Sequence, residues 1–517
     1  MSDVPIAGVS TVPRSTVVEL VAGPEDVPGM LEQAAGRIAA LAGGALVDRG
    51  GDGLEVDLGC GARAVMRVTQ ELRADPVAAG PKFQLHLDIH TPGVRDAAWL
   101  DRWATVWQEL PFSGLELGRF AVQLPLTTSV SGTLATSSPL AGRAVLVTGH
   151  FLSGLPHMVD CLAQMGAPTD AMTVLGKDYS YRLRHRVAGT LRERGMSVAS
   201  CDQAQQAVAE HSERAARRGL RALALDDGGY VAPLLAGHLR AQAPLWDGVV
   251  EQTMSGIFRL EPIRDALCFP IFPVAQSQAK GRLEMYWIAD KAVSTALDLA
   301  APLKIEGQAA LVLGYGHLGR QVAGTLKDRR MRVAVYDTDI LRLIEAHEHG
   351  YLTSRDLPTL LSRHAPLIVF GATGRTSLTR EHFAALPRDA FLASVTSRDT
   401  EFDLPALLAM ATPGPSHDGV SLSFRLPTSV AVVVLADGRP VNFHETDSIG
   451  SLNSDLVRAA MLVGAHAVAR DGARHAPGPD PAWADQALAK SGLLEDYYQR
   501  YGPTIPRADT GRAVTLA

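Results

Sequence analysis

Cysteine is scarce and scattered in this chain. The 517 residues include four cysteines, with no C-x-x-C pair and no histidine at metal-ligand spacing: Cys60, Cys161, Cys201 and Cys268. A disulfide framework or a structural zinc site needs such residues at short, regular spacings. The sequence therefore argues against both, and we expect no metal.

Long apolar runs and an excess of basic residues are missing as well. No segment holds the roughly eighteen consecutive apolar residues of a membrane helix, and the N-terminus MSDVPIAGVSTVPRS lacks the basic-then-apolar pattern of a signal peptide. The net charge of −6 argues against nucleic acid or another polyanion as a partner. We expect a cytoplasmic protein without a membrane partner, and the length indicates two or three domains.

Lysine is rare in comparison with arginine. The chain has seven lysines and forty-two arginines. Because lysine can give up its proton and arginine cannot, a lysine in such a chain hints at chemistry that needs a titratable amine. Lys280 is the candidate, in a predicted loop, 275–284, that leads into a helix ending at Leu299.

Residues 309–337 carry the clearest pattern in the chain. A buried parallel strand is predicted at 309–313, followed by the G-x-G-x-x-G turn Gly314-Tyr-Gly316-His317-Leu318-Gly319, a helix, and a second strand that ends in Asp337. This strand–turn–helix–strand order is the setting that a dinucleotide fingerprint requires. The alternative is an ordinary βαβ unit with a glycine turn.

Each residue type of the fingerprint has a physical reason. Gly314 permits the tight turn, Gly316 lets the backbone approach a pyrophosphate, and Gly319 lets helix and strand pack closely. The following helix offers free N–H groups to the phosphates. Asp337 would accept hydrogen bonds from the adenosine ribose and repel a 2′-phosphate, which favours NAD over NADP.

The first 130 residues are predicted to form a separate α/β unit. Helices are expected at 30–41 and 97–110, and strands at 54–58, 64–68 and 83–89, the first two joined as a hairpin by Gly59-Cys60-Gly61. A linker is expected at 127–138, which is polar and lacks periodicity.

Further motifs follow one another along the chain. They are Pro139-Leu-Ala-Gly leading to His150, Leu225-Asp226-Asp227-Gly-Gly229, Glu251-Gln252-Thr253-Met-Ser-Gly256, Ser277-x-x-Lys280, the glycine turn at 314–319, Asp399-x-Glu401-x-Asp403 and Val441-Asn442. Taken alone, each motif is weak evidence, and the acidic pair by itself is slightly better explained as a turn or cap than as a site. In this order and at this spacing, the chain from about Pro139 to Val468 resembles the S-adenosylhomocysteine hydrolase family. Residues 1–130 have no counterpart there.

The resemblance implies an α/β fold in four segments. A Rossmann-type NAD domain, 291–443, would be inserted in an α/β substrate domain composed of 139–290 and the C-terminal return 444–517. An extra N-terminal α/β domain, 1–130, of unknown role would precede them. A homo-oligomer, dimer or tetramer, is expected.

The implied chemistry is a redox-neutral cycle on a nucleoside. NAD oxidises the ribose 3′-hydroxyl, which acidifies the C4′ proton; a base removes that proton, the C5′ group leaves, water can add, and the hydride returns. In this scheme Lys280 takes the 3′-hydroxyl proton beside Glu284, His150 donates to the leaving group, and Asp227 is the candidate base. The implied substrate contacts are Glu251, Gln252, Asp226 and His444. The implied cofactor contacts are Gly314, Gly316, His317, Leu318, Gly319, Asp337, Thr253, Thr373 and Asn442.

The chain departs from the family in the pocket. Gln252 replaces a glutamate, Met285 an asparagine, Leu152-Ser-Gly154 the Thr-x-Glu that contacts adenine, and Thr396-Ser-Arg-Asp399 a Gly-His-Phe-Asp. A Gly-His-Pro-Ser after Asn442 is missing, although His444 and Asp447 could partly substitute for it.

These departures indicate a changed substrate, because lost polar contacts weaken base selection severely. We favour a nucleoside lyase or dehydratase in nucleoside antibiotic biosynthesis. The alternatives are S-adenosylhomocysteine hydrolysis proper, a non-catalytic NAD-binding regulator, and a plain nucleoside dehydrogenase or epimerase.

Overall fold

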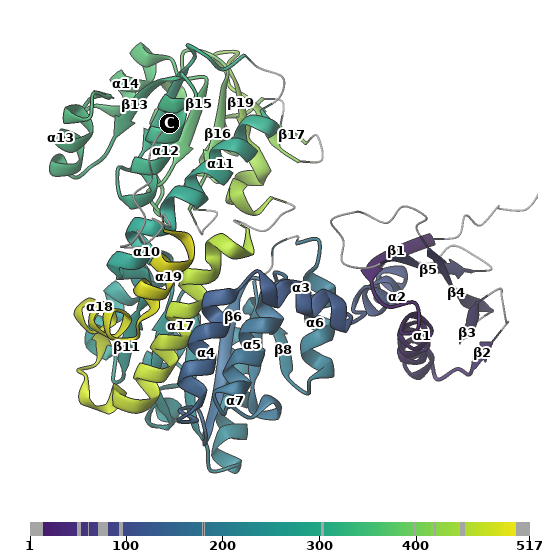
Figure 1. Cartoon of the computed structure of the whole chain (residues 1–517). Coiled ribbons are helices and arrows are strands. Elements are labelled where there is room, and N and C mark those ends of the chain that lie inside the picture. Colours follow the sequence, from purple (N-terminus) through teal and green to yellow (C-terminus); the bar gives the residue numbers. More distant parts are fainter. Residues whose placement is uncertain are drawn as a thin grey trace, which may run out of the picture.

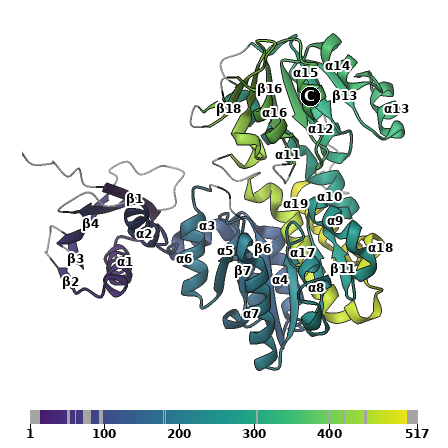
Figure 2. The same ribbon diagram turned by 180° about the vertical axis from the view of Figure 1, so that it is seen from behind.

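The computed structural model contains three α/β units, each built on its own sheet. It describes residues 14–48, 53–59, 61–70, 81–91, 97–177, 179, 181–300, 304–396, 400–412, 414–417, 420–444 and 450–502. The expectations for Cys60, Asp399 and Asp447 lie outside these residues. Figures 1 and 2 show the N-terminal unit to one side of two larger units that stand one above the other.

The N-terminal unit is an antiparallel sheet covered on one face by two helices, α1 (Val27–Ala42) and α2 (Ala97–Gln108). Its strand order is β1 (Arg14–Val21), β5 (Lys82–His90), β4 (Ala62–Gln70), β3 (Leu54–Gly59) and β2 (Leu46–Asp48). The predicted hairpin is confirmed, because β3 and β4 pair antiparallel with Val56 opposite Ala64. Alternation of apolar and polar residues along β3 and β5 buries one face against the helices.

The predicted linker is wrong, since most of it forms a helix, α4 (Pro125–Ala135). Small polar side chains, Thr127 and Ser131, are buried where α4 packs against the C-terminal helix α17 (Ser451–Asp471). The Asp455 carboxylate of α17 accepts hydrogen bonds from the backbone N–H groups of Leu126 (2.7 Å) and Thr127 (2.9 Å). A tightly packed helix with small residues has no apolar stripe, which is why the sequence pattern suggested a linker.

The second unit is a parallel sheet with helices on both faces. Its strand order is β20 (Gly478–Pro479), β11 (Pro270–Pro273), β10 (Trp246–Glu251), β9 (Arg221–Asp226), β6 (Arg143–Gly149), β7 (Thr173–Gly176) and β8 (Ser197–Ser200). One face is covered by α4, α17, α5 (Leu155–Gln164), α6 (Arg184–Glu193) and α18 (Pro481–Lys490). The other is covered by α7 (Ala204–Arg217), α8 (Ala232–Ala236) and α9 (Met254–Leu260).

The third unit is a Rossmann-type sheet. Its strand order is β14 (Leu352–Thr353), β13 (Arg332–Tyr336), β12 (Ala309–Leu313), β15 (Ile368–Gly371), β16 (Ala390–Ser394), β19 (Ala431–Val434), β18 (Leu422–Arg425) and β17 (Ser416–His417). Neighbours are parallel from β14 to β19, and the last two strands are antiparallel. Its helices are α11 (Met285–Leu299) and α12 (His317–Asp328) on one face, and α14 (Leu357–His364), α15 (Arg380–Ala384) and α16 (Leu404–Met410) on the other, with α13 (Ile340–Glu348) after β13.

The Rossmann-type unit is inserted in the second unit, as predicted. The chain leaves the second sheet after β11, builds the third sheet, and returns as α17, β20, α18 and α19 (Leu493–Tyr501). Helix α17 packs on β9 and β10, so most of its residues are buried. No helix in the described parts of the chain is both long and apolar enough to cross a membrane.

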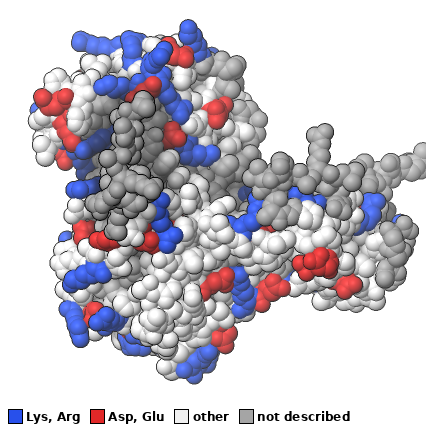
Figure 3. Space-filling view, viewed as in Figure 1, with Lys and Arg blue, Asp and Glu red and all other residues white. Residues whose placement is uncertain are grey.

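Basic and acidic side chains are intermixed over the face in Figure 3. The N-terminal unit is joined to the second unit by a short helix, α3 (Gly114–Val122), whose Glu116 forms a buried two-pronged ion pair with Arg186 of α6. The same guanidinium donates to the backbone carbonyl of Glu19 in β1 (3.0 Å). One arginine therefore ties together elements of both units.

Candidate active site

A cavity of about 830 Å³ lies between the second and third units. Parallel strands of both sheets end at it, including β6 and β9 on one side and β12 and β15 on the other. Carboxyl ends of parallel strands are where open α/β sheets bind ligands. Its lining includes these residues from the sequence-based prediction: His150, Asp227, Gln252, Thr253, Lys280, Glu284, Gly314, Gly316, His317, Leu318, Asp337, Thr373 and Asn442.

The glycine turn after β12 fits a dinucleotide. Gly314 has φ +91°, and a Cβ at Gly319 would lie 1.9 Å from the Gly314 carbonyl oxygen, so both positions demand glycine. A Cβ at Gly316 would have Arg342 as its nearest neighbour at 3.8 Å, which leaves space over that backbone. The N-terminus of α12 faces this space, as an anion site requires.

Asp337 directly follows β13 and lines the cavity, and its carboxylate also supports the turn. Its Oδ2 accepts a hydrogen bond from the Tyr315 backbone N–H (2.6 Å), and its Oδ1 accepts one from Asp339 N–H (2.8 Å). Arg342 lies near it, with Nη1 3.9 Å from Oδ2. Asp337 therefore fixes the backbone of the turn and also places a carboxylate at the cavity.

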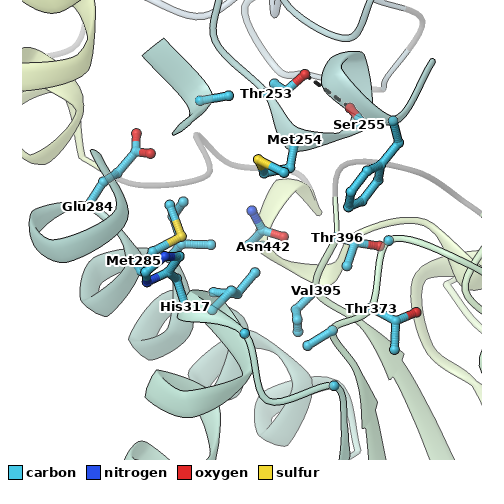
Figure 4. Close-up of a pocket in the computed structure, with 18 of the residues that line it drawn as sticks. Thr253, Met254, Ser255, Glu284, Met285, His317, Thr373, Val395, Thr396 and Asn442 are labelled. Atoms are coloured by element: carbon cyan, nitrogen blue, oxygen red, sulfur yellow. Dashed lines mark hydrogen bonds between the residues drawn. The ribbon is translucent and has the colours of Figure 1, made fainter. Parts of the chain in front are cut away.

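A buried glutamate holds the glycine-rich turn after β15. Glu401 accepts hydrogen bonds from the backbone N–H groups of Thr373 (3.1 Å) and Gly374 (3.0 Å) and from the Thr373 hydroxyl (2.7 Å). Thr373, Val395, Thr396 and Asn442 come together on one side of the cavity (Figure 4).

Lys280 lies on a helix where the sequence predicted a loop. The Ser277 hydroxyl caps α10 (Gln278–Leu283) by accepting from the Lys280 N–H (3.3 Å). One turn later Glu284 places its Oε2 3.1 Å from the Lys280 Nζ, and both side chains are largely buried. The backbone of Gly281 approaches the His317 ring, so the lysine helix touches the glycine turn of the third unit.

The other end of the cavity is built around His150 and Asp227. The Asp227 Oδ2 accepts a hydrogen bond from the Gln252 amide (2.6 Å) and lies 3.6 Å from the His150 Nε2. The His150 Nδ1 bonds to the Tyr181 hydroxyl, and its ring stacks on Phe443 with centroids 4.1 Å apart. The structure thus brings the two predicted residues together.

Lys177 completes this cluster and was missed by the sequence reasoning. It follows β7 at the carboxyl end of the sheet, is 6% exposed, and places its Nζ 2.5 Å from Asp227 Oδ1 and 3.3 Å from His150 Nε2. The signal that would have found it is the one that marked Lys280, since it is another of the chain's seven lysines.

The charges of the cluster shift its protonation equilibria. Burial opposes ionisation of Asp227, but the charge of Lys177 and the hydrogen bond from it lower the Asp227 pKa to about 2. Burial and the Lys177 charge lower the pKa of His150 to about 3, against the attraction of Asp227. Burial would lower the pKa of Lys177, yet Asp227 raises it above its ordinary value.

Three predicted substrate contacts do not reach the cavity lining. The Glu251 carboxylate is 1% exposed and accepts from the N–H groups of Gly228, Gly229 and Thr253. Asp226 is buried beside it and accepts from Val231 N–H, and half-buried His444 lies just beyond Phe443. The Glu251 carboxylate therefore holds the backbone of the glycine turn at 228–229 rather than facing the cavity.

Comparison with known proteins also indicates NAD as the cofactor. Residues 285–448 match the family model for the NAD-binding domain of S-adenosyl-L-homocysteine hydrolase. An uncharacterized protein of Mycobacterium tuberculosis is 30% identical over 351 residues, which is 64% of this chain and 66%, just under two thirds, of that relative. An adenosylhomocysteinase of Nostoc sp. is 23% identical over 381 residues, 71% of this chain and 86% of that protein. Among solved structures, the 2-hydroxyacid dehydrogenase from Ketogulonicigenium vulgare Y25 covers 62% of this chain and 95% of that chain, at 15% identity and a TM-score of 0.37.

Proposed function

We propose that this chain, which belongs to the adenosylhomocysteinase-like family as a divergent member, is a nucleoside lyase that uses NAD in a redox-neutral cycle. The observation that supports it is that the dinucleotide turn, the Lys280–Glu284 pair and the His150–Asp227 pair all line one cavity. An oxidation site and a proton-transfer site within one cavity suit a substrate that meets both during one turnover.

Bound NAD would accept and return a hydride at the sugar. Lys280 would take the hydroxyl proton at its Nζ, and Glu284, 3.1 Å away, would hold that ammonium in place. Thr253, Thr373 and Asn442, which all line the cavity, would contact the cofactor, with Asn442 lying between the other two (Figure 4). The Asp227 carboxylate would face the sugar carbon whose proton is removed.

Loss of water is the step that we favour for the C5′ end. Five apolar residues, Leu152, Leu155, Met158, Val457 and Met461, line the cavity from the segment after His150 and from α17, where Ser454 and Arg458 are the polar residues among them. Such a wall selects a base weakly, because discrimination depends on buried polar partners. We therefore expect an altered nucleoside that loses water across C4′–C5′, with a product of the kind found in nucleoside antibiotic biosynthesis.

The test is mass spectrometry on purified protein. Denatured protein should release NAD at close to one equivalent per chain, and a panel of nucleosides should yield a product about eighteen mass units lighter without net NADH. Lys280→Ala should abolish turnover, whereas Lys490→Ala, at the exposed end of α18, should not. A protein that neither carries nor takes up NAD would contradict the proposal.

S-adenosylhomocysteine hydrolysis is the second candidate, because the matched Nostoc protein bears the name adenosylhomocysteinase. It predicts free thiol from S-adenosylhomocysteine, which a thiol reagent detects. Thiol release with no loss of water from any nucleoside would favour it over the lyase.

A further inference from the structure

We propose that Lys177 is a positioning residue that fixes His150 as a neutral imidazole with its proton on Nδ1, so that the His150–Asp227 pair enters the reaction as a proton acceptor. The sequence-based scheme gave His150 the opposite role, that of donor. The role in elimination rests on the proposed function. The protonation state of His150 does not, because it is argued from the geometry alone.

The hydrogen-bonding capacity of lysine decides the tautomer. An ammonium group has three donors and no acceptor, so the His150 Nε2, 3.3 Å from the Lys177 Nζ, must accept. A neutral imidazole that accepts at Nε2 carries its proton on Nδ1. That nitrogen bonds to the Tyr181 hydroxyl, which can accept it.

The surroundings of the ring leave little room for a second proton. Three basic residues act on His150 from different elements: Lys177 after β7, Arg458 on α17 and Lys280 on α10. Asp227 opposes them, but its Oδ1 is engaged by Lys177 at 2.5 Å and its Oδ2 by Gln252 at 2.6 Å. The two tyrosines, Tyr179 and Tyr181, and Phe443 surround the ring without adding a negative charge.

Lys177 therefore serves as the positive partner of Asp227, a role that a protonated His150 would otherwise have. A buried carboxylate needs a positive partner, and Lys177, with a side chain 4% exposed, supplies it to Asp227. If that charge is removed, the histidine 3.6 Å away becomes the nearest group able to bind a proton and balance the carboxylate. The lysine thus decides which member of the cluster holds the proton.

The consequence is an elimination of water in which one proton moves from C4′ to the His150–Asp227 pair and then to the leaving oxygen. The pair would accept the proton from C4′, the C4′–H electrons would form the 4′,5′ double bond, and the C5′–O bond would break. The accepted proton would then pass to the leaving oxygen, which departs as water. No further acid is required, so the charges and atoms balance.

The test is nitrogen-15 NMR of ring-labelled histidine in the full-length protein, with His150→Gln to assign the signal. In the wild type, Nε2 should show the shift of an unprotonated nitrogen, and His150 should not titrate above pH 5. In Lys177→Met its titration should move up by on the order of two pH units, while Lys490→Met should match the wild type. Lys177→Arg, which keeps the charge, should restore the low titration.

Two results would overturn the inference, and neither depends on turnover. One is a wild-type His150 that carries its proton on Nε2 or titrates near pH 6.5. This measurement uses the wild-type protein and so does not depend on whether a Lys177 variant folds. The other is a folded Lys177→Met with an unchanged His150 titration. NAD content, measured on the same samples, separates failure of this inference from failure of the proposed function.

Discussion

Alanine substitutions at Gly316, Gly319 and Gly324, in the turn after β12 and in α12, should separate effects on stability from effects on NAD affinity. At Gly319 an alanine Cβ would lie 1.9 Å from the Gly314 carbonyl oxygen and 2.9 Å from its carbon, both of them backbone. Neither atom can move without displacing the turn from the end of β12. Overpacking of this kind costs about 1–3 kcal/mol of stability, and a displaced turn no longer presents its N–H groups to the pyrophosphate.

Gly316 and Gly324 provide matched comparisons for Gly319. A Cβ at Gly316 meets no protein atom closer than 3.8 Å, yet it would fill the space over the turn where the pyrophosphate is expected. A Cβ at Gly324, in the middle of α12, has nothing within 4 Å, and alanine in a helix interior is better than glycine by about 1 kcal/mol. Gly319→Ala should thus lose stability and NAD affinity, Gly316→Ala affinity alone, and Gly324→Ala neither.

The assay is calorimetric titration of NAD into cofactor-free protein, with chemical unfolding of the same samples. We expect at least a tenfold loss of affinity, or about 1.4 kcal/mol, for the first two variants. Gly324→Ala should bind as the wild type does and unfold at slightly higher denaturant. Tight NAD binding by Gly319→Ala would refute the close approach of α12 to β12, and tight binding by Gly316→Ala would place the pyrophosphate elsewhere.

Two further changes test the charges around the site and the joint between units. Asp337→Arg should weaken NAD binding, because Tyr315 N–H loses its 2.6 Å acceptor, and should raise the ratio of NADP to NAD affinity; an unchanged ratio would contradict the ribose assignment. Arg186→Leu should lower stability by about 3–5 kcal/mol, because it leaves the Glu116 carboxylate buried without its partner. The matched change Arg192→Leu breaks an exposed pair with Glu109 and should cost less than about 1 kcal/mol. Equal losses in chemical unfolding would mean that the buried pair does not anchor the N-terminal unit.

Much of the cofactor site could be predicted because its requirements are local. Gly314, Gly316 and Gly319 owe their identity to a turn only a few residues long, and Asp337 directly follows the next strand. Strand, turn and helix must then occur in that order, so spacing alone is informative. Lys280 was found by composition, although the helix around it was not, because its cap depends on Ser277, which also reads as a loop residue.

The rest depended on contacts between distant segments. Glu251 looked like a ligand residue in the sequence, but folding turns its carboxylate onto the N–H groups of Gly228 and Gly229. The helix α4 was taken for a linker, because the partner that buries it, α17, lies more than 300 residues further along. Contacts between such distant segments leave no periodic pattern in the local sequence.

By itself, then, the sequence determined that the chain binds a dinucleotide on a Rossmann-type unit, because glycine geometry and strand order are properties of neighbouring residues. Only the tertiary structure decided which charged side chains surround His150 in the cavity. His150, Lys177 and Asp227 each come directly after a different strand, β6, β7 and β9. Their polar groups act on one another only because the sheet brings those strand ends close together.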